Sequence, residues 1–206
     1  MSASAPDSAG AAPAPHPLVG AAAEGVLPAW AEASEARIDH MRRVAILLDE
    51  WAEELRLDGA TRARWRAAAW LHDALREADP GRLAAEVDPG LRGLPPALLH
   101  GPAAASRLRA EGVADQELLQ AVAYHTIGVA GLAGTGRMLY VADFLDPGRT
   151  FAPSWRAELR ARMPADSAAV LPHVVGARIR YLIDAGSAVR GETLGFWNAL
   201  VEEEER

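Results

Sequence analysis

The sequence predicts an all-α protein, a bundle of helices joined by short connections. From Pro28 onward, apolar residues recur at the three- and four-residue spacing of helices. Hardly any stretch shows the two-residue alternation of a strand. Glycine, proline and aspartate interrupt the helical patterns at short intervals, and this favours many short turns.

Composition limits the classes of function. The chain has 206 residues, half of them apolar, enough for one domain with a full core. With no cysteine, disulfides, thiolate catalysis and cysteine-bound zinc are excluded. A formal net charge of −7 argues against nucleic acid as a partner. Every basic residue is arginine, so a bound anion would be held by guanidinium groups.

Residues 1–27 are rich in alanine, proline, serine and glycine, which predicts a disordered tail in which His16 has no role. This segment does not resemble a secretory signal, and no stretch is apolar enough to span a bilayer. We therefore expect a cytoplasmic protein whose single folded domain covers residues 28–206 and contacts no membrane. The sequence carries no indication of an oligomeric state.

The first half contains two long predicted helices. Met41, Val44, Leu48 and Trp51 form the apolar stripe of a helix over 28–57, which the Asp-Gly pair at 58–59 ends. A second helix is expected over 60–77, up to the sequence ADPG. Four prolines within 80–98 predict short turns there.

Shorter helices follow. One begins at a proline and ends at a glycine over 101–112, and Asp115 can cap the next, over 116–126. A glycine-rich loop over 128–136 leads into the apolar run RMLYVADFL. The remaining helices are expected near 154–163, 166–186 and 192–203.

Several polar residues stand where the helices should be buried. His40, His72 and His125 lie on apolar faces, Asp143 interrupts an apolar run, and His100 stands at a helix entry. Each histidine alone is more often a satisfied core residue than a ligand. Buried carboxylates, however, are costly unless they are paired or bound to metal. The whole set can converge on one centre in a bundle: His40, His72, Asp73, His100, His125 and Asp143.

Imidazole and carboxylate ligands without sulfur suit iron, manganese, cobalt, nickel or zinc. Six ligands exceed the four of a structural zinc and suffice for two metals that share a carboxylate. Neighbouring helical residues differ by about 100° in direction, so His72 and Asp73 can both face the centre, with Asp73 as the bridge. Such a metal pair can activate water and neutralise a phosphoryl oxygen.

The pattern H…HD…H…H…D resembles the HD-domain superfamily of metal-dependent phosphohydrolases. The motifs RIDHMRRV (37–44), AAWLHDALRE (68–77), LLHGPAAASRL (98–108), AVAYHTIG (121–128) and LYVADFLDPGRTF (139–151) are similar to those of its bacterial YqeK-type members. These members hydrolyse diadenosine tetraphosphate symmetrically to two ADP. The resemblance covers about residues 28–202.

The resemblance implies a helical HD fold with a two-metal centre, for which iron is the expected metal. One metal would be held by His40, His72, Asp73 and Asp143. Asp73 would bridge to a second metal, held also by His100 and His125. Thr126 and Arg149 match positions near the substrate phosphates. Arg76 stands where relatives often carry lysine, and Asp146 where they often carry glutamate.

The sequence therefore predicts a hydrolase in which a hydroxide held between two metals attacks a phosphorus of a dinucleoside polyphosphate. Asp73 and Arg76 are the expected catalytic residues. Arg76, Arg137 and Arg149 are candidates to balance phosphate charge. Tyr140, Phe144 and Phe151 can stack on an adenine, although core packing is the commoner role of such residues. Two alternatives stay open: an HD-type nucleotidase acting on other nucleotides, and a non-catalytic metal-binding HD module.

Overall fold

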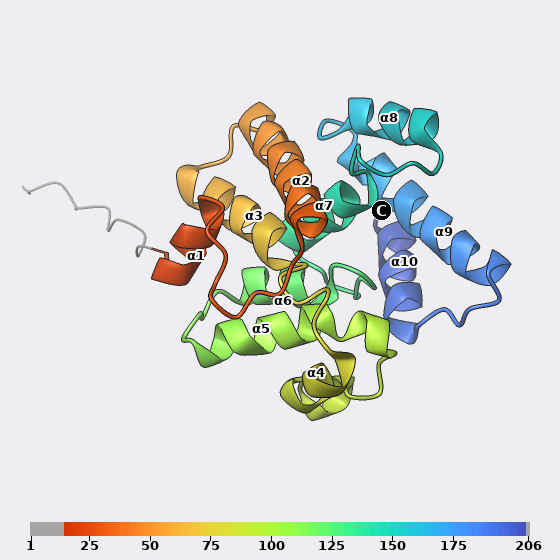
Figure 1. The fold of residues 1–206 in the computed structure, drawn as a ribbon. Helices are drawn as coiled ribbons and strands as arrows, with labels where there is room; N and C mark the ends of the chain where they lie inside the picture. Colours follow the sequence, from red (N-terminus) through yellow and green to blue (C-terminus); the bar gives the residue numbers. More distant parts are fainter. Residues whose placement is uncertain (1–14, 205–206) are drawn as a thin grey trace, which may run out of the picture.

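The fold is known from a computed structural model, which describes residues 15–204, and this part of the chain contains helices and no strand. Figure 1 shows the helices in chain order. The α-helices are α1 (Pro17–Ala23), α2 (Glu35–Glu54), α3 (Gly59–Leu71), α4 (Pro80–Glu86), α5 (His100–Ala110), α6 (Gln116–Tyr124), α7 (Gly134–Phe144), α8 (Pro153–Arg162), α9 (Ser167–Asp184) and α10 (Gly191–Glu204). Two 3₁₀ turns, Pro89–Leu91 and Pro96–Leu98, precede α5. The predicted all-α class is confirmed.

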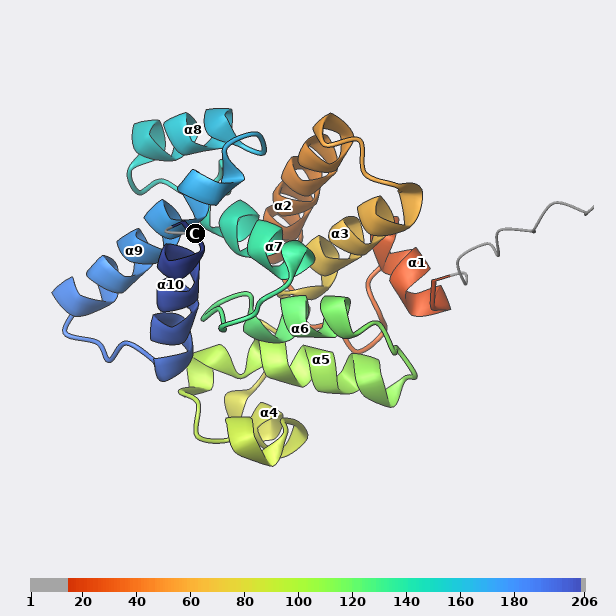
Figure 2. The same cartoon turned by 180° about the vertical axis from the view of Figure 1, so that it is seen from behind.

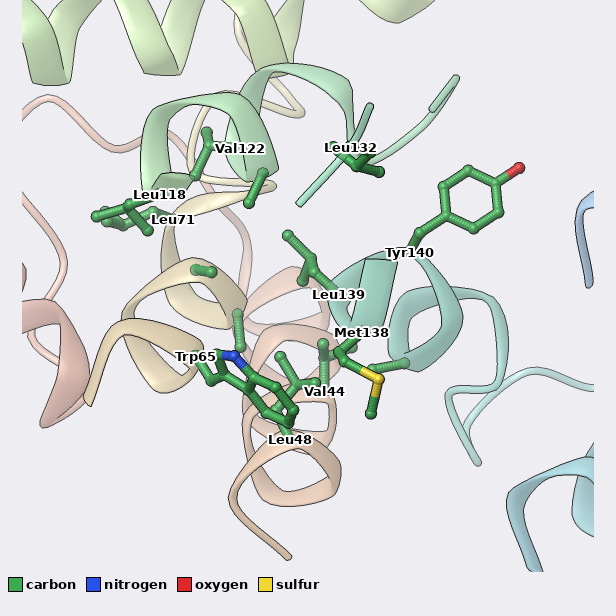
Figure 3. Packing of buried hydrophobic residues seen from close by; sticks show 14 of the residues in the cluster. Val44, Leu48, Trp65, Leu71, Leu118, Val122, Leu132, Met138, Leu139 and Tyr140 are labelled. Carbon is green, nitrogen blue, oxygen red and sulfur yellow. The ribbon is translucent and has the colours of Figure 1, made fainter. Parts of the chain in front are cut away.

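Helix α3 lies at the centre of the first half and contacts α1, α2, α6 and α7. Its run Ala67, Ala68 and Ala69 is fully buried, and these small side chains let neighbouring helices approach closely. Figure 3 shows part of the core between these helices, to which α3 contributes Leu71 and α6 contributes Leu118. The carboxyl-terminal half of α3 is enclosed on most sides and is correspondingly apolar, whereas its amino-terminal half carries Arg62, Arg64 and Arg66 in partly exposed ion pairs.

Helix α7 joins the two halves of the molecule. It contacts α2, α3 and α6 on one side and α9 on the other, and Figure 2 shows it between the two groups. In the second half α10 packs against α9. Phe196 of α10 is fully buried and meets the ring of Tyr140 edge-on, with ring centres 5.5 Å apart. The second half is thereby anchored to α7.

Helix boundaries follow side-chain caps that the periodicity does not show. The helix predicted from residue 28 begins only at Glu35, because the Ser34 hydroxyl accepts the backbone N–H of Arg37. Asp58 caps α3 in the same way, and Asp115 caps α6 as predicted. The region 80–98 was expected to hold only turns, yet α4 forms there because Asp79 caps it and Pro80 fits the first helical position.

The structure differs most from the prediction in the segment that was expected to complete the second helix. Helix α3 ends at Leu71 rather than near residue 77. Beyond it the backbone closes tighter turns, in which the N–H of Ala74 donates to Leu71 and that of Arg76 donates to Asp73. His72 and Asp73 therefore lie on a tight turn at the carboxyl end of a buried helix, not within the helix.

The expected disordered tail is wrong for part of its range. Residues 17–23 form α1, which packs on α3 and buries Val19 and Ala22. His16, which was given no role, caps this helix: its Nδ1 accepts the N–H of Leu18 at 3.3 Å. The composition of the segment concealed a short helix that tertiary contacts hold in place. Residues 1–14 of the expected tail lie outside the described residues.

None of the helices in the described part of the chain is long and apolar enough to cross a membrane.

Candidate metal centre

The six predicted ligand residues come together at the junction of α2, α3, α5, α6 and α7. His40 lies in α2, His100 is the first residue of α5, and His125 directly follows α6. His72 and Asp73 follow α3, and Asp143 lies in the last turn of α7. Most of these side chains stand at helix ends, where the chain can turn a side chain toward a common point.

The carboxylate of Asp73 lies between two groups of imidazoles. Its Oδ1 is 3.2 Å from His100 Nε2 and 3.5 Å from His125 Nε2. Its Oδ2 is 3.7 Å from His40 Nε2 and 3.6 Å from His72 Nε2. Each oxygen thus faces a different pair of histidines, which is the arrangement a bridging carboxylate needs.

Distances within each group are equally short. His40 Nε2 lies 3.1 Å from Asp143 Oδ1 and 3.4 Å from His72 Nε2. His100 Nε2 lies 3.1 Å from His125 Nε2. One atom each of His40, His72 and Asp143 forms a group spanning no more than 4.8 Å, and His72, Asp73 and His125 form a second. These two groups share His72.

The imidazole rings are oriented by their outer nitrogens. Nδ1 donates to the carbonyl three residues earlier in each of His72 (2.7 Å), His100 (3.0 Å) and His125 (2.9 Å). A carbonyl oxygen can only accept, so Nδ1 carries the proton in these three residues. Their Nε2 lone pairs therefore face the centre, which is the tautomer that binds a metal.

His40 has a different outer partner. Its Nδ1 donates to Asp146 Oδ2 at 2.8 Å, and Asp146 also accepts two hydrogen bonds from Arg43. A carboxylate behind a ligand histidine increases its basicity and fixes its ring. Asp146 was noticed in the sequence only as a departure from related proteins, and the structure shows what it touches.

The protonation states of the centre suit cation binding. Burial lowers the pKa of His72 to about 4, and burial also lowers the pKa of His100, so both are neutral near pH 7. Burial would raise the pKa of Asp73, but the imidazoles of His72 and His100, which are protonated in the acid range where Asp73 titrates, hold this pKa well below its usual value. The pKa of Asp143 is likewise low, because the hydrogen bond from His40 and the nearby charge of Arg149 together outweigh the effect of burial. The buried carboxylates are thus ionised.

The pKa of His40 is shifted in the opposite direction from those of His72 and His100. Burial lowers its pKa, but hydrogen bonds to Asp143 and Asp146 outweigh this and raise the pKa to about 9. Two carboxylates on one imidazole favour a cation there, whether a proton or a metal, and metal binding would release the proton. Imidazole nitrogens and ionised carboxylates, with carboxylate or carbonyl oxygens behind the rings, make this donor set fit a pair of transition-metal dications.

The cluster opens into a cavity of about 310 Å³, called here the inner cavity. Asp73, His100, His125 and Asp143 reach its wall, while His40 and His72 lie beneath them. Among the expected phosphate contacts, Arg76, Thr126 and Arg149 line the cavity. The Thr126 hydroxyl donates to His125 Nε2 at 2.9 Å, and Arg149 pairs with Asp143.

Arg137 does not reach this cavity, which corrects the expectation for this residue. Both of its terminal nitrogens pair with Glu203 of α10 at 2.7 Å, and its Nε donates to the Leu132 carbonyl. Arg137 lies at the opposite end of α7 from Asp143, and its side chain ties α10 to the loop before α7.

Three further arginines line the inner cavity although sequence reasoning missed them: Arg37, Arg156 and Arg178. Arg37 Nη1 donates to Asp73 Oδ2 at 2.6 Å, and its place three residues before His40 on one helix was a usable signal. Arg156 and Arg178 come from α8 and α9, where no motif marks them. Five arginines against two aspartates leave the cavity wall with an excess of positive charge when its histidines are neutral. A polyanion is the ligand this wall favours.

These features define a class: an all-helical protein with a candidate metal centre at the floor of a cationic cavity. The chain belongs to the HD domain family, whose model matches residues 37–170. This match confirms the resemblance seen in the sequence.

Two named relatives are similar in sequence to part of this chain. The protein called "Bis(5'-nucleosyl)-tetraphosphatase, symmetrical" from Staphylococcus aureus is 34% identical over 122 residues, which cover 56% of this chain and 61% of that protein. The protein of the same name from Halalkalibacterium halodurans is 28% identical over 108 residues, 52% of this chain and 57% of that protein. The chain thus spans about three fifths of the length of these relatives.

A solved structure confirms the fold. It is described as a predicted HD superfamily hydrolase involved in NAD metabolism from Clostridium acetobutylicum, and it superposes with a TM-score of 0.72. The superposition covers 82% of this chain and 91% of that one at 23% sequence identity. At this identity the likeness concerns the fold alone.

Proposed function

We propose that this protein is a metal-dependent phosphohydrolase that cleaves diadenosine tetraphosphate symmetrically into two ADP. The observation that carries this proposal is the six-residue cluster at the floor of a cavity with excess arginine. The names of the relatives from Staphylococcus aureus and Halalkalibacterium halodurans support the choice of substrate. A cytoplasmic location stays a prediction.

The metals would be held in two groups that share Asp73. His40, His72 and Asp143 would hold one metal, and His100 and His125 the other. Iron is our first choice, and manganese, cobalt, nickel and zinc also suit nitrogen and oxygen donors. When bound, such a pair supplies Lewis acidity toward phosphoryl oxygens and lowers the pKa of water.

The remaining cavity residues would bind and orient the polyphosphate. Arg76 is exposed and forms no ion pair among residues 15–204, so its guanidinium is available to a phosphate oxygen. Thr126 and Arg149 stand next to ligand residues and would fix the phosphate nearest the metals. Because ADP is a tolerable leaving group, Arg76 can assist by its positive charge and need not donate a proton.

Metal content and reaction products test the proposal. Protein purified without oxygen should contain about two transition-metal ions per chain. Absence of metal, with no activity on adding iron or manganese, would contradict a catalytic role. Diadenosine tetraphosphate should give ADP alone. AMP with ATP would rule out symmetrical cleavage, and rapid hydrolysis of deoxynucleoside monophosphates beside an inert dinucleotide would favour the nucleotidase.

A further inference from the structure

A second cavity adjoins the inner one and is not explained by the metal centre. This outer cavity, of about 440 Å³, lies between the end of α7, the loop 148–151, α8 and α9. The two cavities share Phe144, Arg149, Arg156 and Arg178 in their walls. A ligand held at the metal centre could therefore extend into the outer cavity.

Arg156 forms the wall between the cavities and is unusual for an arginine. Its side chain is only 6% exposed, and its guanidinium carbon lies 4.2 Å from the centre of the Phe144 ring. Its Nε donates to the Phe151 carbonyl at 2.8 Å, but its Nη1 is buried without a hydrogen-bond partner in the described part of the chain. A buried charged donor without an acceptor is costly, and a ligand oxygen would remove that cost.

Arg178 adds a second cation at the same wall. It comes from α9 and lines both cavities, with its guanidinium carbon 5.5 Å from the ring centre of Tyr181. Neither Arg156 nor Arg178 forms an ion pair with any carboxylate within residues 15–204. The wall that the two cavities share thus presents two positive charges that no carboxylate within residues 15–204 pairs with, which favours an anionic group there.

Beyond these arginines the outer cavity is aromatic. Phe151, Trp155 and Tyr181 line it, and Phe151 is 72% exposed and Tyr181 56% exposed. Large aromatic side chains exposed together at a cavity mark a binding surface rather than core. Aromatic rings next to arginines are the usual platform for nucleobases, because every base has a flat face that can stack.

We propose that the outer cavity binds one nucleoside of the substrate, with its base against Phe151 and Tyr181. Arg156 and Arg178 would contact the phosphate that links this nucleoside to the metal centre. This inference rests on the proposed function, because it assigns the second cavity to one end of a dinucleoside polyphosphate. The expected consequence is a preference for substrates with a nucleoside beyond the phosphates.

The test compares a substrate with nucleosides and an anion without them. Phe151→Ala and Tyr181→Ala should each raise KM for diadenosine tetraphosphate by roughly 5- to 150-fold, the range for loss of one base–aromatic stack. The inhibition constant of inorganic tetraphosphate should stay unchanged in both variants. Ile183→Ala is the matched control: Ile183 is 62% exposed on the same helix as Tyr181 and does not line the outer cavity. It should change neither value.

An unchanged KM in both variants, or an equal loss for the dinucleotide and for inorganic tetraphosphate, would overturn the proposal while leaving the hydrolase assignment intact. If the wild-type protein does not cleave the dinucleotide, the proposed function fails instead. Binding of ADP to metal-free protein, measured by titration calorimetry, then decides the outer cavity separately. Weaker ADP binding in Phe151→Ala supports the nucleoside site, and unchanged binding refutes it.

Discussion

Replacement of Gly101 by alanine should disturb the candidate metal centre without touching a ligand. Gly101 follows His100 at the start of α5, where the helix crosses the end of α6. A Cβ atom at this position would lie 2.7 Å from the Val122 carbonyl oxygen and 3.0 Å from that of Ala123. It would also lie 3.2 Å from Cε1 of His125. The glycine is therefore required by close helix approach.

The size of the disturbance follows from these distances. Close carbon–oxygen contacts lie at about 3.3 Å or more, so the two backbones must separate by about 0.6 Å. His100 and His125 stand on opposite sides of this contact, with their Nε2 atoms 3.1 Å apart. Metal–ligand distances tolerate only about 0.2 Å. The shift should therefore weaken the half of the centre that these two histidines form.

Two measurements check Gly101→Ala. Overpacking costs about 1–3 kcal/mol, which for a chain of this size lowers Tm by roughly 2–12 °C. A titration with Mn²⁺ should show one of two sites weakened by about 10- to 100-fold, the effect typical of lost positioning contacts. Gly59→Ala is the control, because a Cβ there would meet nothing within 4 Å. Two sites of wild-type affinity and an unchanged Tm in Gly101→Ala would refute the reasoning.

Three other variants test separate parts of the structure. Asp73→Ala should remove bound metal and abolish turnover, as measured by metal analysis and by ADP release. His173→Ala is the control, because His173 is exposed on α9, and it should change neither value. An Asp73→Ala variant that keeps its metal and its activity would contradict the bridging role. Asp146→Asn should weaken metal binding by about 10- to 100-fold in a chelator competition, because it removes the negative charge next to His40 Nδ1. An unaltered metal affinity would show that Asp146 does not strengthen metal binding through His40. Val19→Asn should lower Tm by roughly 2–12 °C at unchanged metal content, since an unsatisfied polar group in the α1–α3 contact costs about 1–3 kcal/mol. A wild-type Tm would mean that α1 does not stabilise the fold.

Two predictions from the sequence, the disordered tail and the role of Arg137, were wrong for the same physical reason. The tail prediction averaged composition over 27 residues and overlooked α1, a seven-residue helix too short to be stable without its contacts to α3. Arg137 was assigned to phosphate because it is an arginine near a motif, yet its partner Glu203 lies 66 residues away. Neither outcome is visible in local patterns, because both depend on which distant segments pack together.

The sequence by itself determined the helical class and the six candidate ligands, because side-chain periodicity and the chemistry of imidazole and carboxylate are local properties. Only the tertiary structure decided how these residues meet. It ended α3 at Leu71, which puts His72 and Asp73 on a turn with each oxygen of Asp73 facing two histidines. It also brought Arg156 and Arg178 from α8 and α9 to the cavity wall. Convergence of this kind depends on the packing of helices far apart in the chain, which no local pattern encodes.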